Sequence, residues 1–308
     1  MLTKLLKIKY PLIQGGMANI ATGKFAAAIS NVGALGIIAA GAMTPEQLEQ
    51  EIFECKKLTE APFGVNIMLL SKYKDELVDV VVKNKVPVVT TGAGNPSSYI
   101  DKLKAAGSLT IPVIPSVGLA RRMEKAGADA VIAEGTESGG HVGELTTMAL
   151  VPQVVEAVKI PVIAAGGIAS GKQIVAAFAL GACGVQVGTC LLVSEECPIH
   201  QNYKDVIIKA KDTDTVVTGR IAGIPVRIFK NKLARTYIAL EKEGKTKEEL
   251  EYFVLGALRK AAHEGDIDDG SVMMGQVAGM LNEIKPAKEI IEDLFASAKL
   301  ELQNLKID

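Results

Sequence analysis

Short apolar runs rich in β-branched residues recur along the first two thirds of the chain. They lie at 11–14, 34–39, 63–68, 86–91, 111–115, 129–134, 161–165 and 183–187. The runs are apolar at odd and even positions alike, which is typical of parallel strands buried on both faces of a sheet. We therefore predict a β-strand at each of them.

Amphipathic segments lie between these runs, at 45–57, 74–84, 97–106 and 151–158 among others. Alternating strands and helices predict an α/β fold, and the number of units favours a (β/α)₈ TIM barrel. An open, doubly wound sheet is the alternative. The barrel is favoured because polar and Gly-rich segments follow many of the strands, and a barrel brings all of these strand ends to one face.

The pattern changes after about residue 192. Helical periodicity appears at 232–243, 247–263 and 286–304, and a Gly-rich stretch at 266–276 interrupts it. We predict a barrel domain over residues 1–195, which would carry the functional site. A small, mostly helical subdomain over 196–308 would pack on that barrel.

The composition of the chain argues against several classes of partner and site. A formal net charge of -1, from 34 basic and 35 acidic residues, gives no reason to expect a nucleic acid or an anionic membrane as partner. The four cysteines have no zinc-site spacing. The first residues lack an apolar signal region, and no run of about 18 apolar residues occurs, so we expect a cytoplasmic protein.

The loop at 134–143 (EGTESGGHVG) is the first candidate for chemistry. It follows a predicted strand, its glycines let the backbone approach a ligand, and His141 supplies a titratable ring. His263 is predicted at a helix C-terminus, where the helix dipole favours its charged form, and we expect it to be structural. His200 is ambiguous. Only His141 follows a predicted barrel strand.

Two further Gly-rich loops follow the seventh and eighth runs, at Gly166-Gly167 and Gly188-Thr189. Loops at these places bind phosphate in many barrels, although glycines there can also serve tight turns alone. Gly15-Gly16 after the first run would let a planar ring approach the backbone. Asn66, inside an apolar run, needs a polar partner that a ligand in the barrel mouth would provide.

The sequence lacks the residues that several common types of catalysis require. No lysine stands at a predicted strand end for a Schiff base, no His/Asp/Glu set has metal-ligand spacing, and no G-x-S-x-G elbow occurs. A phosphate cradle with one histidine and no obvious nucleophile indicates that a cofactor carries out the difficult step. The phosphorylated flavin FMN fits these parts.

These residues belong to longer strings that resemble one family over nearly the whole chain. The strings are Tyr10–Ala18 (YPLIQGGMA), Pro62–Ser71 (PFGVNIMLLS), Val88–Pro96 (VVTTGAGNP), Gly127–Gly135 (GADAVIAEG), Gly139–Gly143 (GGHVG), Pro161–Ile168 (PVIAAGGI), Val185–Thr189 (VQVGT) and Asp269–Gly279 (DGSVMMGQVAG). The chain resembles the FMN-dependent type II enoyl-acyl carrier protein reductases (FabK-type) of bacterial fatty acid synthesis. These enzymes are relatives of the nitronate monooxygenases, once called 2-nitropropane dioxygenases.

Fewer positions separate the two subfamilies. Glu134 resembles the reductases, because many nitronate monooxygenases carry Gln there. Two positions depart from the family pattern: Asn19 stands where Trp is frequent, and Cys190 stands where Arg is frequent. We expect Asn19 to alter the ring environment or the substrate fit, and Cys190 to remove a positive charge near the phosphate.

The resemblance implies that NADH or NADPH reduces FMN, and that the flavin then passes hydride to the β-carbon of a trans-2-enoyl thioester. His141 is the implied catalytic residue, as hydrogen-bond donor to the thioester oxygen or as general acid. The resemblance also implies acyl carrier protein as a transient partner, a homodimer, and stimulation by a monovalent cation such as K⁺ or NH₄⁺. The implied FMN-binding residues are Gly15, Gly16, Met17, Asn66, Glu134, Gly139, Gly166, Gly167, Gln186, Gly188 and Thr189.

Other functions remain open on the sequence alone. A nitronate monooxygenase would use His141 toward an alkyl nitronate and reoxidise the flavin with O₂. A flavin-free barrel lyase or isomerase would use the same phosphate loops to hold a sugar phosphate. A scaffold without catalysis is the remaining alternative.

Overall fold

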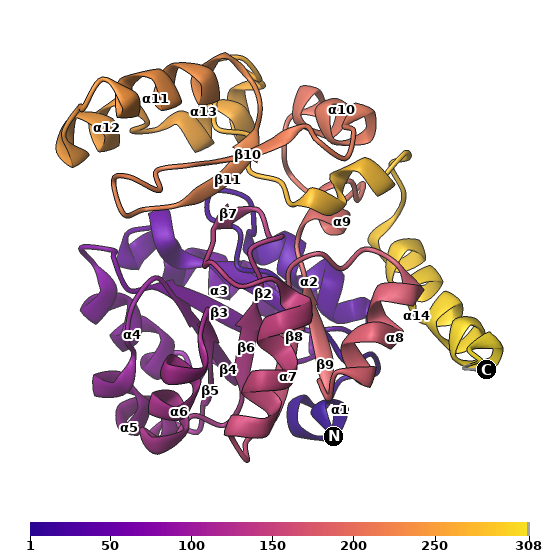
Figure 1. Cartoon of the computed structure of the whole chain (residues 1–308). Coiled ribbons are helices and arrows are strands. Elements are labelled where there is room, and N and C mark those ends of the chain that lie inside the picture. The colour runs from indigo at the N-terminus through magenta and orange to yellow at the C-terminus, as the bar shows by residue number, and fades with distance from the viewer. Residues whose placement is uncertain (307–308) are drawn as a thin grey trace.

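Eight parallel strands form a barrel in the computed structural model, which describes residues 1–306 (Figure 1). Neighbouring strands follow the order β1-β9-β8-β6-β5-β4-β3-β2 around the sheet. This arrangement confirms the predicted TIM barrel, and each strand lies within three residues of its predicted position. The strands are β1 (Leu12–Gln14), β2 (Gly36–Ala39), β3 (Phe63–Met68), β4 (Val88–Gly92), β5 (Leu109–Ile114), β6 (Val131–Glu134), β8 (Val162–Ala165) and β9 (Gly184–Val187).

The barrel closes between β1 and β2 through one bridge, Ile13 to Leu35. The side chain of Gln14 strengthens this seam, since its Nε2 donates to the carbonyl oxygen of Ile37 at 3.2 Å and its Oε1 accepts from the Ile37 N–H at 3.4 Å. Gln14 is fully buried, so these bonds also satisfy its amide. The side chain thus adds to the two backbone hydrogen bonds of this seam, from Gln14 N–H to Leu35 O and from Leu35 N–H to Leu12 O, both at 2.9 Å.

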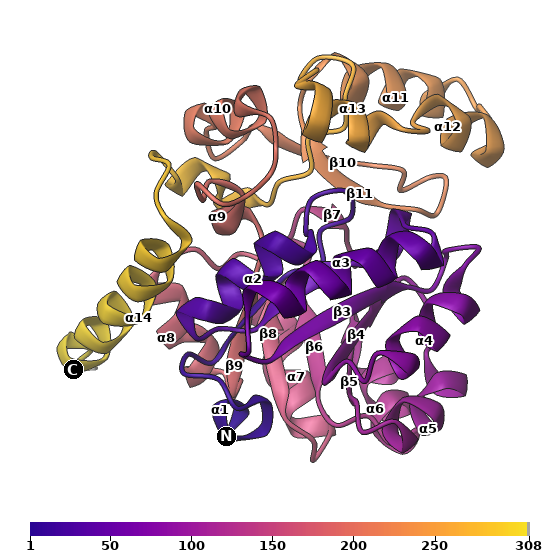
Figure 2. The same cartoon turned by 180° about the vertical axis from the view of Figure 1, so that it is seen from behind.

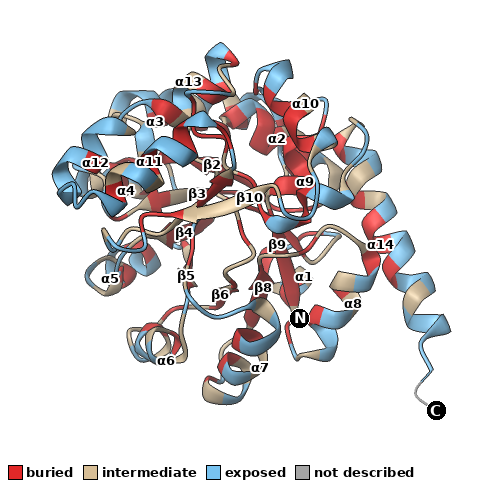
Figure 3. Cartoon of the chain, turned by 45° about the horizontal axis from the view of Figure 1, so that its top comes forward, coloured by how far each residue is buried: buried red, intermediate tan, exposed pale blue. Residues whose placement is uncertain are grey.

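Helices surround the barrel, and their outer faces are exposed (Figure 3). Most begin at a Ser or Thr whose hydroxyl accepts from a backbone N–H, as at Thr44 before α3 and Ser116 before α6. Helix α7 starts four residues earlier than predicted because the Glu137 carboxylate accepts from the Thr147 N–H and caps its first turn. The ring helices are α2 (Gly23–Val32), α3 (Pro45–Leu58), α4 (Lys74–Lys83), α5 (Ser97–Ala105), α6 (Val117–Lys125), α7 (Thr147–Ala157) and α8 (Gly171–Ala179).

The last helix, α14 (Ala287–Asn304), completes this ring, because it packs against both α8 and α2 (Figures 1 and 2). The packing is close: a Cβ on Gly171 would lie 2.4 Å from the backbone nitrogen of Ala298. The rings of Tyr10 and Phe295 stack with centroids 5.1 Å apart. The chain therefore returns to the barrel at its end, and the predicted division at residue 195 stays a prediction.

Between β9 and α14 the chain builds a cap over the carboxyl ends of the strands (Figure 1). The cap contains a β-hairpin that the sequence analysis did not predict, and the predicted helix at 247–263 is broken at Gly256, where φ is 76°. The cap elements are α9 (Thr189–Leu192), α10 (Gln201–Lys209), β10 (Thr215–Thr218), β11 (Val226–Phe229), α11 (Lys232–Lys242), α12 (Lys247–Phe253), α13 (Ala257–Glu264) and the 3₁₀-helix η2 (Gln276–Met280).

Strand β11 also pairs with a two-residue strand, β7 (Gly140–His141), and so ties the cap to the barrel. The opposite end of the barrel is closed by α1 (Leu2–Leu6), whose Leu2 and Leu6 join the aliphatic cluster inside the barrel. No helix among residues 1–306 is long and apolar enough to cross a membrane.

Candidate functional site

A cavity of about 430 Å³ opens at the carboxyl ends of the barrel strands, beneath the cap. Its walls include every site residue that the sequence predicted: His141, Gly15, Gly16, Met17, Asn66, Glu134, Gly139, Gly166, Gly167, Gln186, Gly188 and Thr189. Loops far apart in the sequence therefore meet at one place, as the barrel topology requires. The roles assigned to these residues stay predictions.

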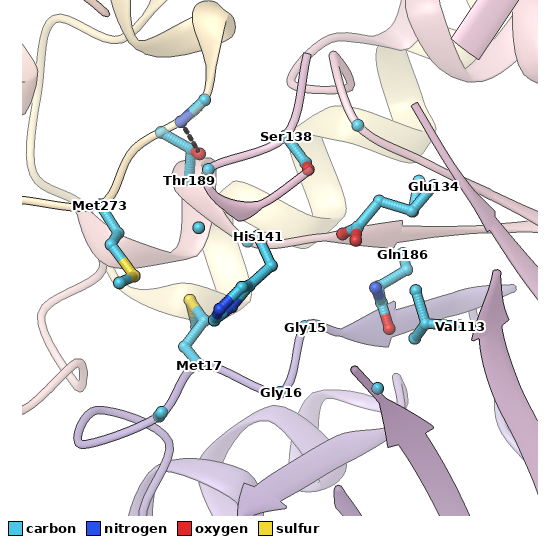
Figure 4. Close-up of a pocket in the computed structure, with 18 of the residues that line it drawn as sticks. Gly15, Gly16, Met17, Val113, Glu134, Ser138, His141, Gln186, Thr189 and Met273 are labelled. Carbon is cyan, nitrogen blue, oxygen red and sulfur yellow. Dashed lines mark hydrogen bonds between the residues drawn. The ribbon is translucent and has the colours of Figure 1, made fainter. Parts of the chain in front are cut away.

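Polar side chains from three strands form the floor of the cavity. Asn66 lies on β3, Glu134 ends β6 and Gln186 lies on β9; Figure 4 shows Glu134 and Gln186 facing the same space. Asn66 Oδ1 accepts from Thr90 Oγ1 at 2.9 Å, and its Nδ2 has no hydrogen-bond partner among residues 1–306. The Gln186 amide forms no hydrogen bond with the described residues. Such amides satisfy their hydrogen-bonding groups best with a polar ligand.

Glu134 is the most perturbed acid of the cavity. Burial raises the pKa of Glu134 to about 7, because little water remains to solvate the ionised carboxylate. The nearby Ser138 hydroxyl opposes this rise in the pKa, although Ser138 Oγ forms no hydrogen bond in the described part of the chain. Near neutral pH the Glu134 carboxyl can therefore act as a donor in one molecule and an acceptor in the next.

His141 reaches the cavity from strand β7, where it pairs with Val226 of β11. Its imidazole is open to the cavity, but the walls exclude part of the water around it, and this desolvation lowers the pKa of His141. The ring is therefore neutral at pH 7 and carries one N–H donor. His200 caps α10 and His263 lies in the last turn of α13; both are exposed and outside the cavity.

Glycines form the remaining wall on one side of the cavity. A Cβ on Gly16 would lie 2.4 Å from Asn66 Cγ, so only glycine allows this close approach. Gly166 and Gly167 have φ angles of 91° and 71°, in the left-handed region that favours glycine. Their loop leaves its backbone facing the cavity next to Gly188, which suits an anionic or planar ligand.

The segment after α13 contributes residues that were not predicted individually as site residues. The Gly275 N–H donates to Thr189 Oγ1 at 2.9 Å, a bond drawn in Figure 4. A Cβ on Gly275 would lie 2.7 Å from the carbonyl oxygen of Glu137, which itself accepts from the Gln276 N–H. The family-like string at 269–279 was the available signal, but only the fold shows that it meets the loop of His141.

The cap side of the cavity is mostly apolar. Met273 lines it beside Gly140, and Leu258 reaches it from α13. Ile20, Leu192 and Val277 extend this surface. The cavity thus has a polar floor and an apolar wall, which together suit an amphiphilic substrate or a ligand with a hydrocarbon part.

The two positions that depart from the family pattern differ in their location. Asn19 lines the cavity with φ at 59°, a left-handed conformation that Asn tolerates better than most residues. Cys190 is buried in the core behind Thr189, and burial raises the pKa of its thiol to about 12. Cys190 therefore does not face the cavity. Among the described residues, no group of three His, Cys, Asp or Glu could hold a metal ion.

Comparisons with known proteins agree with this geometry. The family model described as nitronate monooxygenase matches residues 1–77 and 70–297. A solved structure of FabK from Thermotoga maritima superposes with a TM-score of 0.96 at 51% identity, covering 98% of this chain and 97% of that one.

Two curated relatives match nearly the full chain. A probable nitronate monooxygenase of Staphylococcus aureus (strain MSSA476) is 36% identical over 96% of both chains. The (3aS,4S,5R,7aS)-5-hydroxy-7a-methyl-1-oxo-octahydro-1H-indene-4-carboxyl-CoA dehydrogenase of Rhodococcus jostii (strain RHA1) is 32% identical, over 96% of this chain and 95% of that protein. The matched proteins thus have differently named activities, although this chain is similar to each of them over nearly its full length.

Proposed function

The chain belongs to the nitronate monooxygenase family, and we propose that within this family it is an FMN-dependent enoyl-acyl carrier protein reductase. It reduces trans-2-enoyl thioesters to saturated acyl thioesters with NAD(P)H, in bacterial type II fatty acid synthesis. The observation that carries this proposal is the likeness to FabK over almost the entire chain, at 51% identity. The polar floor, glycine wall and apolar cap side of the cavity support it.

The residues of the cavity fit FMN. The Gly166-Gly167 and Gly188-Thr189 loops would hold its phosphate through backbone N–H groups. Gly15 and Gly16 would let the ring system approach the backbone, and Asn66 Nδ2 and the Gln186 amide would bind its polar edge. When bound, FMN accepts hydride from NAD(P)H and delivers it to the β-carbon of the thioester, while a proton reaches the α-carbon.

His141 would stabilise the charge that develops on the substrate. As hydride arrives at the β-carbon, negative charge builds on the thioester carbonyl oxygen. A neutral imidazole can donate its N–H to that oxygen, and the lowered pKa of His141 keeps the ring neutral at pH 7. To act as general acid, His141 would need its protonated form, which the lowered pKa disfavours at pH 7, so we favour the hydrogen-bond donor role. Glu134, from the floor, would help to bind the flavin rather than meet the thioester.

The test is anaerobic oxidation of NADH and NADPH by the purified, FMN-loaded protein with crotonyl-CoA, and then with a crotonyl thioester of acyl carrier protein. Butyryl-CoA, which lacks the double bond, is the matched control. Oxidation that requires the double bond is the expected result. No dependence on it, with FMN still bound, would reject the proposal.

A nitronate monooxygenase is the second candidate, because the family model and a relative at 36% identity carry that description. Turnover of an alkyl nitronate with O₂, without any enoyl thioester activity, would favour it. Cytoplasmic location, a homodimer, stimulation by K⁺ or NH₄⁺ and the preferred nicotinamide cofactor remain predictions of the sequence.

A further inference from the structure

Arg227 of β11 is a buried cation next to the loop that carries His141. Only 6% of its surface is exposed. Its Nε and Nη2 donate to the carbonyl oxygen of Thr136 at 3.0 and 2.9 Å, and its Nη1 donates to Thr215 Oγ1 at 3.0 Å. Two of its three hydrogen bonds therefore converge on one backbone oxygen, 91 residues away in the sequence.

This cation forms no direct ion pair with the residues that the structure describes. Among residues 1–306, no carboxylate forms an ion pair with Arg227, whereas Arg220 of the same hairpin pairs with Glu144 at the surface. The Glu137 carboxylate of the neighbouring loop attracts the guanidinium without forming an ion pair, and Arg220 repels it. Taking a charge out of water without a direct ion pair is costly, and hydrogen bonds to neutral acceptors offset only part of this cost. A residue kept here at such a cost is a candidate for a functional role.

The backbone of Arg227 holds the other side of the same loop. We call residues 135–141 the His141 loop. In the β11–β7 pairing, Arg227 lies opposite Gly140 and Val226 lies opposite His141. The Arg227 side chain thus clamps the start of the His141 loop at Thr136, while its main chain pairs with the end.

The loop needs such a clamp because of its composition. Gly135, Gly139 and Gly140 give its backbone more freedom than other residues would, and Gly140 has φ at 80°. Apart from β7, the tethers of its backbone to other segments are Gly135 N–H to Ala165 O on β8, Thr136 N–H to Leu145 O and Gln276 N–H to Glu137 O. None of these three reaches the hairpin, so within residues 1–306 Arg227 alone links the start of the loop to β11 by hydrogen bonds.

We propose that Arg227 is a positioning residue: by holding the His141 loop in place, it fixes the position of the His141 side chain. The hairpin β10–β11 is then part of the active site, although Arg227 does not line the cavity. This inference rests on the proposed function for its kinetic test. A displacement of a catalytic group by about 1 Å can lower turnover about 100-fold, so loss of the clamp should reduce kcat.

The experiment compares Arg227→Met, Arg227→Lys and the matched control Thr215→Val, each as FMN-loaded protein. Arg227→Met removes the fork, Arg227→Lys keeps the charge with a single donor point, and Thr215→Val removes only the acceptor remote from the loop. We expect kcat to fall at least about tenfold in Arg227→Met, with KM and FMN affinity unchanged. Arg227→Lys should recover part of kcat, and Thr215→Val should match the wild type.

A second readout does not depend on turnover. The chain has three histidines, so the imidazole signal of His141 in a ¹H–¹³C NMR spectrum can be assigned with a His141→Ala variant. This signal should be single and sharp in the wild type and in Thr215→Val. It should split or broaden in Arg227→Lys and Arg227→Met, as the ring loses its fixed position.

The outcomes separate this inference from the proposed function. A wild type without enoyl reduction would reject the function, and the NMR signal would still decide the role of Arg227. An unchanged kcat and an unchanged His141 signal in both Arg227 variants would overturn the inference. Loss of FMN binding would also overturn it, because Arg227 would then build the cavity. If Arg227→Met fails to fold, Arg227→Lys carries the test.

Discussion

The two halves of the barrel interior are built from the same strands but have opposite chemistry. In the lower half, Ile37, Ile132 and Ile163 are fully buried and form an aliphatic cluster that α1 closes from below. Glu134 lies two residues after Ile132 on β6 and shares its inward face. Ala165 has the same relation to Ile163 on β8. The view from the cap side shows these buried strands gathered inside the ring of helices (Figure 3).

The difference shows that inward-facing residues only two positions apart on one strand can serve different purposes. The lower residue stabilises the fold, and the upper one lines the cavity. Side chains that share a face of a strand lie in successive layers of the barrel. The lower layers exclude water and hold the strands together. The upper layer faces a cavity and can carry groups that would destabilise a closed core, such as a carboxyl with a pKa near 7. The separation predicts different consequences for substitutions only one layer apart.

The largest effect is expected at the top, for His141→Ala. Loss of the donor to the thioester oxygen should lower kcat for crotonyl-CoA about 100- to 1000-fold. FMN affinity should not change, because the backbone and the glycine wall remain. Steady-state kinetics and a fluorescence titration with FMN measure the two quantities. His263→Ala, at an exposed helix end outside the cavity, is the control, and equal turnover in both variants would remove His141 from the mechanism.

The next effect is expected one layer down, for Ile132→Ala. Removing most of a fully buried side chain leaves a cavity, so the free energy of unfolding should fall by about 2–5 kcal/mol. Turnover per folded molecule should stay close to that of the wild type. Urea unfolding and kinetics at a temperature where both proteins are folded provide the data. The control is Ile221→Ala, a 76% exposed position on the hairpin, which should change stability by at most about 0.5 kcal/mol.

The pH dependence of stability tests the upper layer of the barrel, and Glu134→Gln is the variant for this test. The folded-state pKa of Glu134 is raised from 4.5 to about 7, so the folded protein binds a proton more tightly than the unfolded chain. The stabilisation this provides is complete below about pH 4.5 and is lost as pH rises to about 7, a change of about 3 kcal/mol.

Glutamine cannot ionise, so flavin-free Glu134→Gln should lose less stability than the wild type between pH 5 and pH 8. Urea unfolding of both proteins at the two pH values measures this. Parallel pH dependences in the two proteins would mean that Glu134 is well solvated.

The smallest effect is expected at the glycine wall, for Gly16→Ala. The new Cβ would displace the Asn66 side chain, 2.4 Å away, and FMN affinity should fall about tenfold, or 1.4 kcal/mol. Gly118→Ala is the matched control, because no atom lies within 4 Å of the added Cβ there, in α6. FMN titration of both variants decides, and equal affinities would show that Asn66 does not contact the flavin.

Much of the site was predictable because its residues lie in local patterns. Strand ends, glycine pairs and His141 could be located by period and composition, and the glycine pairs and His141 line the cavity. The hairpin β10–β11 also had a local signal that was not used, since TVVT and VRIF flank a loop that contains Gly219 and Gly223. The break at Gly256 was missed because the helical periodicity of the cap continues on both sides of it.

The sequence by itself determined the eight strands, the carboxyl-end loops and the residue types that the cavity needs, because side-chain period and backbone freedom are local properties. Only the tertiary structure decided that α14 completes the helix ring and that Arg227 meets Thr136 across 91 residues. The pKa values of Glu134 and His141 are likewise tertiary, since they depend on how much water the assembled walls exclude. Contacts between distant segments arise when the barrel closes and the cap folds over it, and the local sequence pattern does not specify which residues then meet.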